Sequence, residues 1–459
     1  MTWAGELQSE IGGQILTDEA TCCTLATDFG HLVTRKPQAV VRPASTDDVA
    51  RVVKFATKHS LAVGTRGGGH SQSGQSLSDQ ILLDMGALDK PISVDEGELS
   101  VRCQAGIKWR ALVEHLSPQK LSPPVLTNNL DVTVGGTLST AGLGVASWRY
   151  GTQADNCLEL EVVTGTGDIV RCSTSQNREL FDAVRAGVGQ FGVMTEAVLK
   201  LRRHQPKFRS FYLLYDDLTV LLEDLKTVMT DERFDYLEGW CAPCPQGFKK
   251  MGGERQPFAQ WFFPLHGTVE VAEGAAPAAA EKLAGLKFYK HVHTEDGELP
   301  QFFARLDDLF ALWKRAGYWD YTHPWMECVL PWQTTEMYIG QVLANLPPAA
   351  LVGGHVLLWP GRGKASSVPL FMRPQGEFLM GFGILPAFPK AFLELALPRL
   401  NMASQGASML GGKRYISGWV DFREAQWKAH YGAAWPTVLA LKKQFEPHSI
   451  LNPGFIKFE

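Results

Sequence analysis

A glycine-rich loop followed by a histidine is the part of the chain whose residue types point most directly to chemistry. Gly67, Gly68 and Gly69 stand in a row, and His70 follows them at once. Because glycine has no Cβ, this backbone can turn at positive φ and bring its N–H groups close to a ligand. N–H groups gathered in a tight turn form an anion-binding nest that suits a pyrophosphate. The loop therefore predicts a nucleotide cofactor that is held by backbone and contacted, or bonded, by His70. The alternative is a histidine that is only solvated or hydrogen-bonded.

Short strands and a helix must position this loop. The stretch 37–43 predicts a strand, and the helix that follows begins near Ser45 and continues to about residue 56. A second apolar strand at 61–63 runs directly into the glycines. The spacing is not G-x-G-x-x-G and no helix is expected after the loop, so the sequence does not contain a Rossmann fingerprint.

The rest of the first half alternates strands with helices and contains a second glycine cluster. That cluster covers 134–144 and is either a second ligand-facing loop or an ordinary glycine-rich turn. The expected strands lie at 81–85, 92–94, 99–103, 158–163 and 194–201, and the expected helices at 107–116 and 181–185. This mixture indicates an α+β fold with small residues gathered at two loops.

The pattern changes at about Arg203, where longer helices and many aromatic residues begin. Residues 218–229 and 300–315 are helical by their hydrophobic period. A chain of 459 residues is too long for one ordinary core, so we expect two domains, or one domain interrupted by another. We place the first domain at 1–203 and the second at 204–419.

Composition and charge restrict the class of protein. Hydrophobic residues make up 45% of the chain and charged residues 20%, which is typical of a globular protein. The net charge of −4 gives no reason to expect nucleic acid or a membrane as partner. No apolar run is long enough to span a bilayer, and the N-terminus lacks the basic and apolar regions of a signal peptide. We expect a cytoplasmic protein without a metal site.

The eight cysteines are scattered along the chain, which agrees with a reducing compartment. Cys241 and Cys244 form a C-x-x-C pair, a spacing that also occurs in redox motifs. No βαβ pattern of the thioredoxin kind surrounds the pair. We therefore favour two incidental thiols over a redox centre.

Six segments of the chain match, in order, the motifs of one enzyme family. They are Arg66–Ser71 with Gly74 and Gln75 for R-G-H-G-H-S…G-Q, Thr133–Ser139 for T-V-G-G-T-L-S, Gly189–Val193 for G-Q-F-G-V, Phe234–Gly239 for F-D-Y-V-E-G, His323–Trp325 for H-P-W, and Trp427–Gly454 for the closing segment. Through them the chain resembles, nearly end to end, the flavoprotein oxidases related to vanillyl-alcohol oxidase, and among these cytokinin dehydrogenase.

The resemblance implies a fold in two parts. The first is a PCMH-type FAD-binding domain of two subdomains, and the second is a substrate or cap domain with an antiparallel sheet flanked by helices. It also implies that residues 420–459, with a helix at about 425–445, return to the first domain.

The same resemblance assigns the cofactor and its attachment. The histidine that bonds to the 8α-methyl carbon of FAD in the family corresponds to His70. Some relatives attach FAD a second time through a cysteine, but none lies between Cys103 and Cys157, so one covalent bond is implied. Thr133 and Ser139 are expected to donate hydroxyl hydrogen bonds near the pyrophosphate. The full set of expected FAD contacts is Arg66, Gly67, Gly68, Gly69, His70, Ser71, Gln75, Thr133, Gly135, Gly136, Ser139, Leu143, Val193, Trp419 and Asn452.

Two departures from the family's motifs concern the substrate. Asn128 stands where the family has the aspartate that takes the substrate's amine proton. Phe455 stands where the family has a glutamine that approaches the flavin. Neither change affects the expected flavin fold, but both put cytokinin itself in doubt as the substrate.

Trp325, Glu327 and Asn128 are the candidate catalytic residues. Trp325 either stacks a planar substrate against the flavin or is a core tryptophan of an aromatic-rich domain. If Trp325 lies on a strand that faces the flavin, Glu327 faces the same way, because strand side chains alternate. A half-buried carboxylate has a raised pKa and suits a general base, but Glu327 is alternatively paired with an arginine or exposed at the rim. Asp131, Tyr321, Tyr415 and Trp419 are further candidates to line the pocket.

The function that these residues and the resemblance indicate is that of an FAD-linked oxidoreductase. Hydride leaves a substrate carbon that bears an amine or hydroxyl, and oxygen or another acceptor reoxidises the flavin. A cytokinin-like N6-substituted adenine is the leading substrate. An oxidase of the same fold that acts on an alkaloid, a sugar or a biosynthetic intermediate is the first alternative. A flavin-binding protein without turnover is the second.

Overall fold

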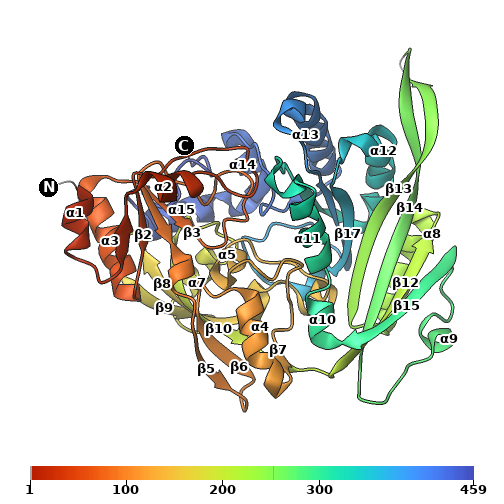
Figure 1. Cartoon of the computed structure of the whole chain (residues 1–459), viewed down its shortest axis with the longest axis horizontal. Helices are drawn as coiled ribbons and strands as arrows, with labels where there is room; N and C mark the ends of the chain where they lie inside the picture. Colours follow the sequence, from red (N-terminus) through yellow and green to blue (C-terminus); the bar gives the residue numbers. More distant parts are fainter. Residues whose placement is uncertain (1–2, 252, 459) are drawn as a thin grey trace.

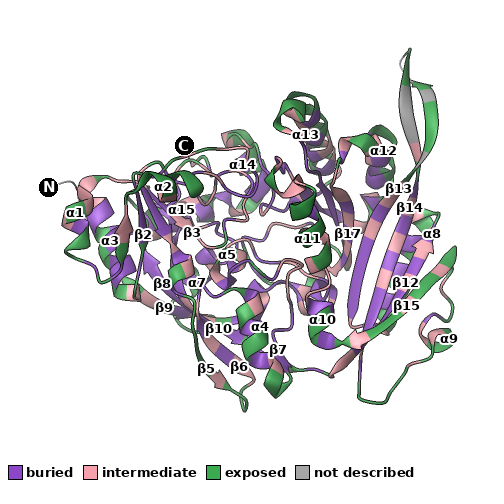
Figure 2. Cartoon of the chain, in the orientation of Figure 1, coloured by how far each residue is buried: buried purple, intermediate pink, exposed green. Residues whose placement is uncertain are grey.

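The computed structural model describes residues 3–251 and 253–458. Two small sheets from the first half of the chain lie on one side of the molecule, and a large sheet from the second half lies on the other (Figure 1). The central strands of the sheets are largely buried, whereas the outer surfaces of the helices are exposed (Figure 2).

A four-stranded sheet with the order β1-β2-β4-β3 carries the glycine loop. Strands β2 (Ala39–Arg42) and β3 (Val63–Arg66) both pair in parallel with β4 (Ile81–Asp84), and β1 (Gln14–Leu16) pairs antiparallel with β2. Helix α3 (Thr46–His59) connects β2 to β3, and the Ser45 side chain caps it by accepting a hydrogen bond from Asp48 N. The apolar residues of β2 and β4 are buried, as parallel strands covered on both faces require. The strands and capped helix predicted around this loop are confirmed.

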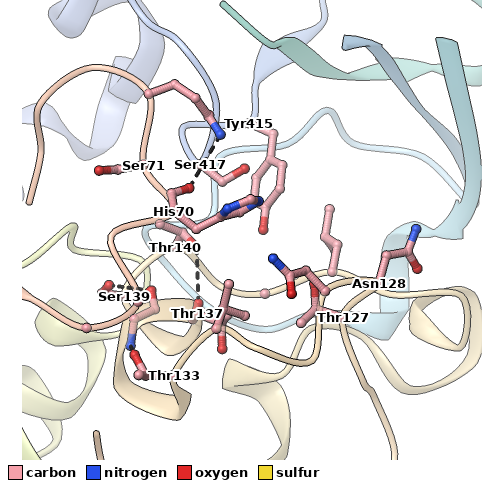
Figure 3. Close-up of a pocket in the computed structure, with 18 of the residues that line it drawn as sticks. His70, Ser71, Thr127, Asn128, Thr133, Thr137, Ser139, Thr140, Tyr415 and Ser417 are labelled. Carbon is pink, nitrogen blue, oxygen red and sulfur yellow. Dashed lines mark hydrogen bonds between the residues drawn. The ribbon is translucent and has the colours of Figure 1, made fainter. Parts of the chain in front are cut away.

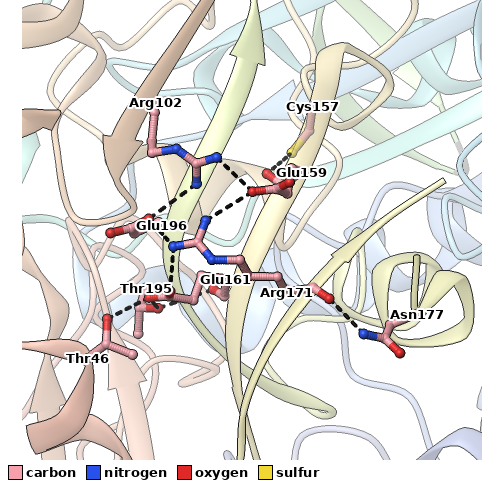
Figure 4. A network of polar contacts seen from close by, with 9 residues as sticks. All are labelled: Thr46, Arg102, Cys157, Glu159, Glu161, Arg171, Asn177, Thr195 and Glu196. Atoms are coloured by element: carbon pink, nitrogen blue, oxygen red, sulfur yellow. Dashed lines mark hydrogen bonds and ion pairs between the residues drawn. The ribbon is translucent and has the colours of Figure 1, made fainter. Parts of the chain in front are cut away.

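A five-stranded antiparallel sheet completes this side of the molecule. Its order is β5 (Pro91–Asp95), β6 (Ser100–Gln104), β10 (Gly192–Lys200), β8 (Cys157–Thr164) and β9 (Ile169–Ser173). Helix α7 (Arg178–Val184) packs on it, and α4 (Trp109–Leu116) follows β6. On one face, Arg102 and Arg171 form ion pairs with Glu159 and Glu196 (Figure 4). Thr46 donates a hydrogen bond of 2.8 Å to Glu161 and so joins α3 to this face.

An eight-stranded antiparallel sheet forms the other side. Its order is β15 (Lys290–Glu298), β12 (Lys207–Tyr215), β14 (Glu254–Val271), β13 (Tyr236–Met251), β17 (His355–Arg362), β18 (Phe378–Leu385), β16 (Met326–Pro331) and β19 (Lys413–Arg414). Helices α8 (Leu218–Asp231), α12 (Trp332–Asn345) and α13 (Leu393–Met409) flank it. The expected antiparallel sheet flanked by helices is therefore present. The hairpin of β13 and β14 extends beyond the rest of the sheet (Figure 1).

Several shorter elements complete the fold. They are α1 (Trp3–Gln8), α2 (Glu19–Thr24), α5 (Val134–Leu138), α6 (Ser147–Tyr150), α9 (Ala279–Lys282), and β7 (Leu121–Ser122) paired with β11 (Arg202–Arg203). Helix α5 lies within the second glycine cluster, where no helix was expected. Thr133 caps this short helix by accepting from Gly136 N.

Two helices predicted as continuous are interrupted. The stretch 300–315 forms α10 (Leu299–Phe303) and α11 (Asp307–Arg315), and between them Arg305 Nε donates to Glu238 Oε2 at 3.2 Å. The stretch 425–445 forms α14 (Glu424–Tyr431) and α15 (Trp435–Phe445). Gly432 lies between them with φ 54°, a conformation that ends a helix.

The C-terminal residues lie against the two small sheets. Helix α15 packs on α7, and Gly165 N donates to Phe445 O at 2.8 Å. Leu451 forms a parallel bridge with Val63, and Asn452 N donates to Val63 O at 2.8 Å. These contacts bring the end of the chain to the strand that leads into the glycine loop. Among the described residues, no helix is long and apolar enough to cross a membrane.

Candidate active site

A large cavity lies where the glycine loop, the second glycine cluster and the eight-stranded sheet meet (Figure 3). It encloses about 1920 Å³ of space, part of it open to solvent. The predicted residues that line it are Arg66, Gly67, Gly68, Gly69, His70, Ser71, Gln75, Asn128, Thr133, Gly135, Gly136, Ser139, Leu143, Val193, Trp325 and Glu327. Predicted residues that are as far apart in the sequence as Arg66 and Glu327 therefore share one site.

The glycine loop is pressed closely against its neighbours. A Cβ on Gly67 would overlap Thr133 Oγ1, and one on Gly69, which has φ 65°, would overlap the Arg66 guanidinium. Within the described part of the chain, the N–H groups of Gly68, Gly69, His70 and Ser71 donate no hydrogen bond. A loop that lines a cavity with such N–H groups fits the phosphates of a dinucleotide. The cradle therefore fits FAD.

His70 lies at the centre of a cluster of aromatic rings. Its ring centroid is 4.1 Å from that of Phe29 and 5.5 Å from that of Trp325. Burial, together with nearby His323, lowers the pKa of His70 to about 3. The imidazole is therefore neutral at physiological pH, and its nitrogen lone pair is available for bonding.

Thr133 and Ser139 make hydrogen bonds within α5 and its cap. Ser139 Oγ donates to Gly136 O at 2.7 Å, and Thr133 Oγ1 accepts from Gly136 N at 3.3 Å. Both residues line the cavity, so their hydroxyl groups border the space beside the glycine loop. Their predicted hydrogen bonds to FAD stay predictions.

Trp419 and Asn452 lie behind the cavity wall rather than in it. Trp419 N donates to Trp325 O at 2.8 Å, so this residue holds the backbone that carries Trp325. Asn452 Oδ1 accepts from Thr65 N at 2.8 Å, and its Nδ2 donates to Gly189 O at 2.8 Å. Thr65 and Gly189 line the cavity, so Asn452 supports its wall. Of the further pocket candidates, Tyr415 lines the cavity, whereas Asp131 and Tyr321 do not.

Glu327 and Trp325 both line the cavity, as the alternation of a strand requires. Trp325 directly precedes β16, and Glu327 is its second residue. Ser417 Oγ donates to Glu327 Oε2 at 3.0 Å. Burial raises the pKa of Glu327 to about 7, against smaller opposing effects of Ser417 and Arg414. Glu327 is therefore neither exposed at the rim nor bonded directly to an arginine through its carboxylate. Its surroundings suit a group that exchanges a proton near neutral pH.

Asn128 is held by two charged residues that the sequence did not single out as site residues. Arg305 Nη2 donates to Asn128 Oδ1 at 2.6 Å, and Asn128 Nδ2 donates to Glu238 Oε1 at 3.1 Å. Burial by itself raises the pKa of Glu238, but the charge and hydrogen bond of Arg305 outweigh it and bring the pKa below its usual value. Glu238 is thus a carboxylate in the cavity wall. The signal that could have found it is the F-D-Y-L-E-G segment.

The end of the cavity beside the large sheet is mostly apolar. Its lining includes Leu306, Phe310, Leu357, Trp359 and Leu385. His355 also lines it, and burial lowers the pKa of this histidine to about 4, so the ring is uncharged. An apolar, aromatic wall with few polar groups suits a planar small molecule. Among the described residues, no group of three or more histidine, cysteine or acidic side chains gathers as it would around a metal ion.

Comparisons with known proteins agree with this division of the site. A family of FAD binding domains matches residues 37–173, and the family described as "Cytokinin dehydrogenase 1, FAD and cytokinin binding" matches residues 271–458. The first match includes the glycine loop with His70, and the second includes Trp325 and Glu327.

Relatives extend the similarity over nearly the whole chain. An uncharacterized oxidoreductase of the fasciation locus of Rhodococcoides fascians is 30% identical over 96% of this chain and 98% of its own. Cytokinin dehydrogenase 9 of Oryza sativa subsp. japonica is 30% identical over 94% of this chain and 87% of its own. Cytokinin dehydrogenase 7 of the same plant is 28% identical over 97% and 91%. With a glycine cradle that fits FAD and a cavity for a small substrate beside it, the chain is an FAD-dependent oxidoreductase that belongs to the cytokinin dehydrogenase family.

Proposed function

We propose that the enzyme oxidises a small planar substrate at a carbon that bears an amine nitrogen, with Glu327 as the base. The observation that carries this proposal is a buried glutamate with a pKa of about 7 that lines the same cavity as His70 and Trp325. FAD supplies the redox chemistry when bound, since it accepts the hydride that leaves the substrate carbon. The residues of the chain place the substrate and take its proton.

Glu327 is proposed to accept the proton of the substrate nitrogen. Its Oε2 already accepts from Ser417, which leaves Oε1 for the substrate. Asn128 is unsuited to this role, because an amide does not take up a proton near neutral pH and its Oδ1 is occupied by Arg305. Glu238 is bound by Arg305 and so kept as a carboxylate of low pKa, which makes it a weaker base.

Trp325 is proposed to hold the planar part of the substrate. Its indole is fixed edge-on to the rings of Phe29 and His70, with centroids at 5.1 Å and 5.5 Å. Aromatic stacking contributes about 0.5–1.5 kcal/mol beyond the area it buries. Together with the apolar wall, this supports an aromatic amine such as an N6-substituted adenine, the class that the similarity to cytokinin dehydrogenases implies. Asn128 and Phe455, which depart from the family's motifs, favour the alternative of an oxidase of the same fold that acts on an alkaloid, a sugar or a biosynthetic intermediate.

We also propose one covalent bond between FAD and His70. Forming it joins an imidazole nitrogen to the 8α-methyl carbon of FAD. The nitrogen with the free lone pair would form the bond, the methyl carbon and the other ring nitrogen would each lose a proton, and the two electrons left on the flavin would pass to oxygen or another acceptor. The neutral state of His70 supports the proposal, because a protonated imidazole has no free lone pair. We further propose a cytoplasmic location, since all eight cysteines are free thiols.

Anaerobic single-turnover kinetics test the role of Glu327. A panel of N6-substituted adenines, alkaloid amines and sugars is mixed with the enzyme, and the loss of flavin absorbance identifies the substrate. With that substrate, Glu327→Gln is expected to slow flavin reduction by about 10²-fold or more, because the amide has lost the basic oxygen. A rate equal to that of the wild type would rule out Glu327 as the base. Bleaching by dithionite alone would instead indicate a protein without turnover.

A further inference from the structure

A short N-terminal segment, 27–30, packs against the loop that carries His70. Phe29 N donates to Gly69 O at 2.9 Å, and Gly30 N donates to Ser71 O at 2.9 Å. These two hydrogen bonds fix the backbone on either side of His70. The catalytic roles proposed for Glu327 and Trp325 do not require them.

Asp28 holds the far side of the same loop. Its Oδ2 accepts from Ser71 Oγ and from Gly74 N, each at 2.8 Å. The residue is only 2% exposed, and its Oδ1 has no hydrogen-bond partner among the described residues. Burying an acidic group with one unpaired oxygen lowers the stability of the fold. The two hydrogen bonds that Asp28 accepts from the loop offset part of this cost.

The packing between segment and loop leaves no room for larger residues. A Cβ on Gly30 would lie 2.5 Å from Gln72 Cα, and a Cβ on Gly74 would lie 2.9 Å from Cγ1 of Val33, three residues after the segment. Phe29 places its ring 4.1 Å from that of His70 and stacks on His323 at 4.2 Å. The imidazole of His70 therefore has a fixed neighbour as well as a fixed backbone.

We propose that Asp28 and Phe29 are positioning residues for formation of the bond between His70 and FAD. This inference depends on the covalent attachment proposed for His70. Three consecutive glycines let the loop approach its ligand, but they also leave its backbone free to move. A bond forms fast only when the reacting atoms are held in near-attack geometry, and a misplacement of about 1 Å can slow a reaction about 10²-fold. The segment 27–30 limits this movement and holds the backbone of the loop in one conformation.

Two substitutions at one position separate the hydrogen bonds from the charge. In Asp28→Asn, the amide oxygen can still accept from Ser71 and Gly74, and the amide nitrogen replaces the oxygen that has no partner. In Asp28→Ala, both hydrogen bonds are lost. Covalent attachment should slow by about tenfold or more in Asp28→Ala and stay within about twofold of the wild-type rate in Asp28→Asn.

The rate is measured on the full-length protein prepared without flavin. FAD is added, samples are quenched in acid and detergent, and the flavin fluorescence that stays with the denatured chain is followed in time. The matched control is Asp48→Ala. Asp48 is 3% exposed and accepts from Gly12 N and Ala44 N at 2.9 Å and 2.8 Å, but it does not contact the loop. This control should lower the melting temperature without slowing attachment.

Each outcome either supports or overturns the positioning role of Asp28 and Phe29. Attachment at the wild-type rate in Asp28→Ala, or equally slow attachment in Asp28→Asn, would overturn the positioning role. If Asp28→Ala does not fold, Phe29→Leu keeps the apolar contact, loses the ring, and should slow attachment, and a wild-type rate there would likewise overturn the role. If the wild type releases all its flavin on denaturation, the bond to His70 itself is disproved, and the positioning role with it.

Discussion

At the scale of single residues, the two carboxyl groups of the cavity have pKa values shifted in opposite directions. Glu238 keeps a low pKa because Arg305 binds it, whereas burial raises the pKa of Glu327 to about 7. When the pKa values of two acids differ in this way, one acid stays ionised near neutral pH while the other exchanges protons. The structure thereby provides a fixed negative charge beside Asn128 and a proton acceptor beside Ser417.

The rate of flavin reduction should depend on pH through Glu327. Below about pH 7 this group is protonated and cannot accept a proton, so the rate is low, and above it the rate rises to a plateau. Stopped-flow measurements with saturating substrate between about pH 5 and pH 9 test this. In Glu327→Gln, flavin reduction should be slow at every pH, and its rate should not rise between these limits.

Glu238→Gln is the matched control for the pH profile. Because the pKa of Glu238 lies below its usual value, this group does not change charge near neutral pH. The substitution should alter the height of the profile but keep its midpoint. A midpoint that disappears in Glu238→Gln and persists in Glu327→Gln would assign the base to Glu238 instead.

Glu327 was singled out as a site residue from the sequence and Glu238 was not, and the difference has a physical cause. Glu327 could be predicted because it stands two residues after Trp325, and side chains of a strand alternate with period two. The place of Glu238 depends on Arg305 and Asn128, which are 177 residues apart in the chain. No local pattern contains such a contact, so only the folded chain brings this cluster together.

At the scale of elements, hydrophobic period predicted which segments are helical but not where they stop. The stretch 300–315 keeps a helical period, and the structure follows it in α10 and α11. The helix breaks between them, where the Arg305 side chain turns to Glu238 and Asn128. A hydrophobic period does not contain tertiary contacts of this kind, so it does not indicate a break at this residue. The glycine loop was easier to place, because its consecutive glycines and His70 are adjacent in the sequence itself.

Gly67→Ala should damage the cofactor cradle. The new methyl group would overlap Thr133 Oγ1, so either the loop or α5 must shift. Overpacking of this kind costs about 1–3 kcal/mol of unfolding free energy. We expect a lower melting temperature and a lower ratio of flavin to protein absorbance in the purified enzyme.

Gly340→Ala is the matched control for the glycine loop. Gly340 lies in α12, and a Cβ there would meet no atom within 4 Å. Alanine in a helix is favoured over glycine by up to about 1 kcal/mol, so stability should be kept or raised. Equal flavin content in Gly67→Ala and Gly340→Ala would contradict the role of close packing in the loop.

At the scale of the whole molecule, the end of the chain closes the cofactor half. Asn452 is 387 residues from Thr65, yet it hydrogen-bonds that residue and Gly189 together. Lys442 Nζ donates to Gln190 O at 2.9 Å and adds a second tie beside it. The domain boundaries at 203 and 419 stay predictions, but these contacts explain why a C-terminal segment would return to the first domain.

Asn452→Ala should make the cavity wall less stable, although the changed side chain does not line the cavity. Thr65 N and Gly189 O would lose their partner, and each buried polar group left unpaired costs about 1–3 kcal/mol. Thermal unfolding should therefore occur at a lower temperature. In a His70→Ala background, where FAD is held only by non-covalent contacts, FAD should dissociate faster, as measured by the recovery of flavin fluorescence on dilution. Asn345→Ala is the control, because Asn345 is exposed in the other half and its side chain donates to Gln341 O, one turn earlier in the same helix. If Asn452→Ala and Asn345→Ala released FAD at the same rate, the hydrogen bonds of Asn452 would stabilise the fold without shaping the cavity wall. The glycine loops themselves would then determine the shape of that wall.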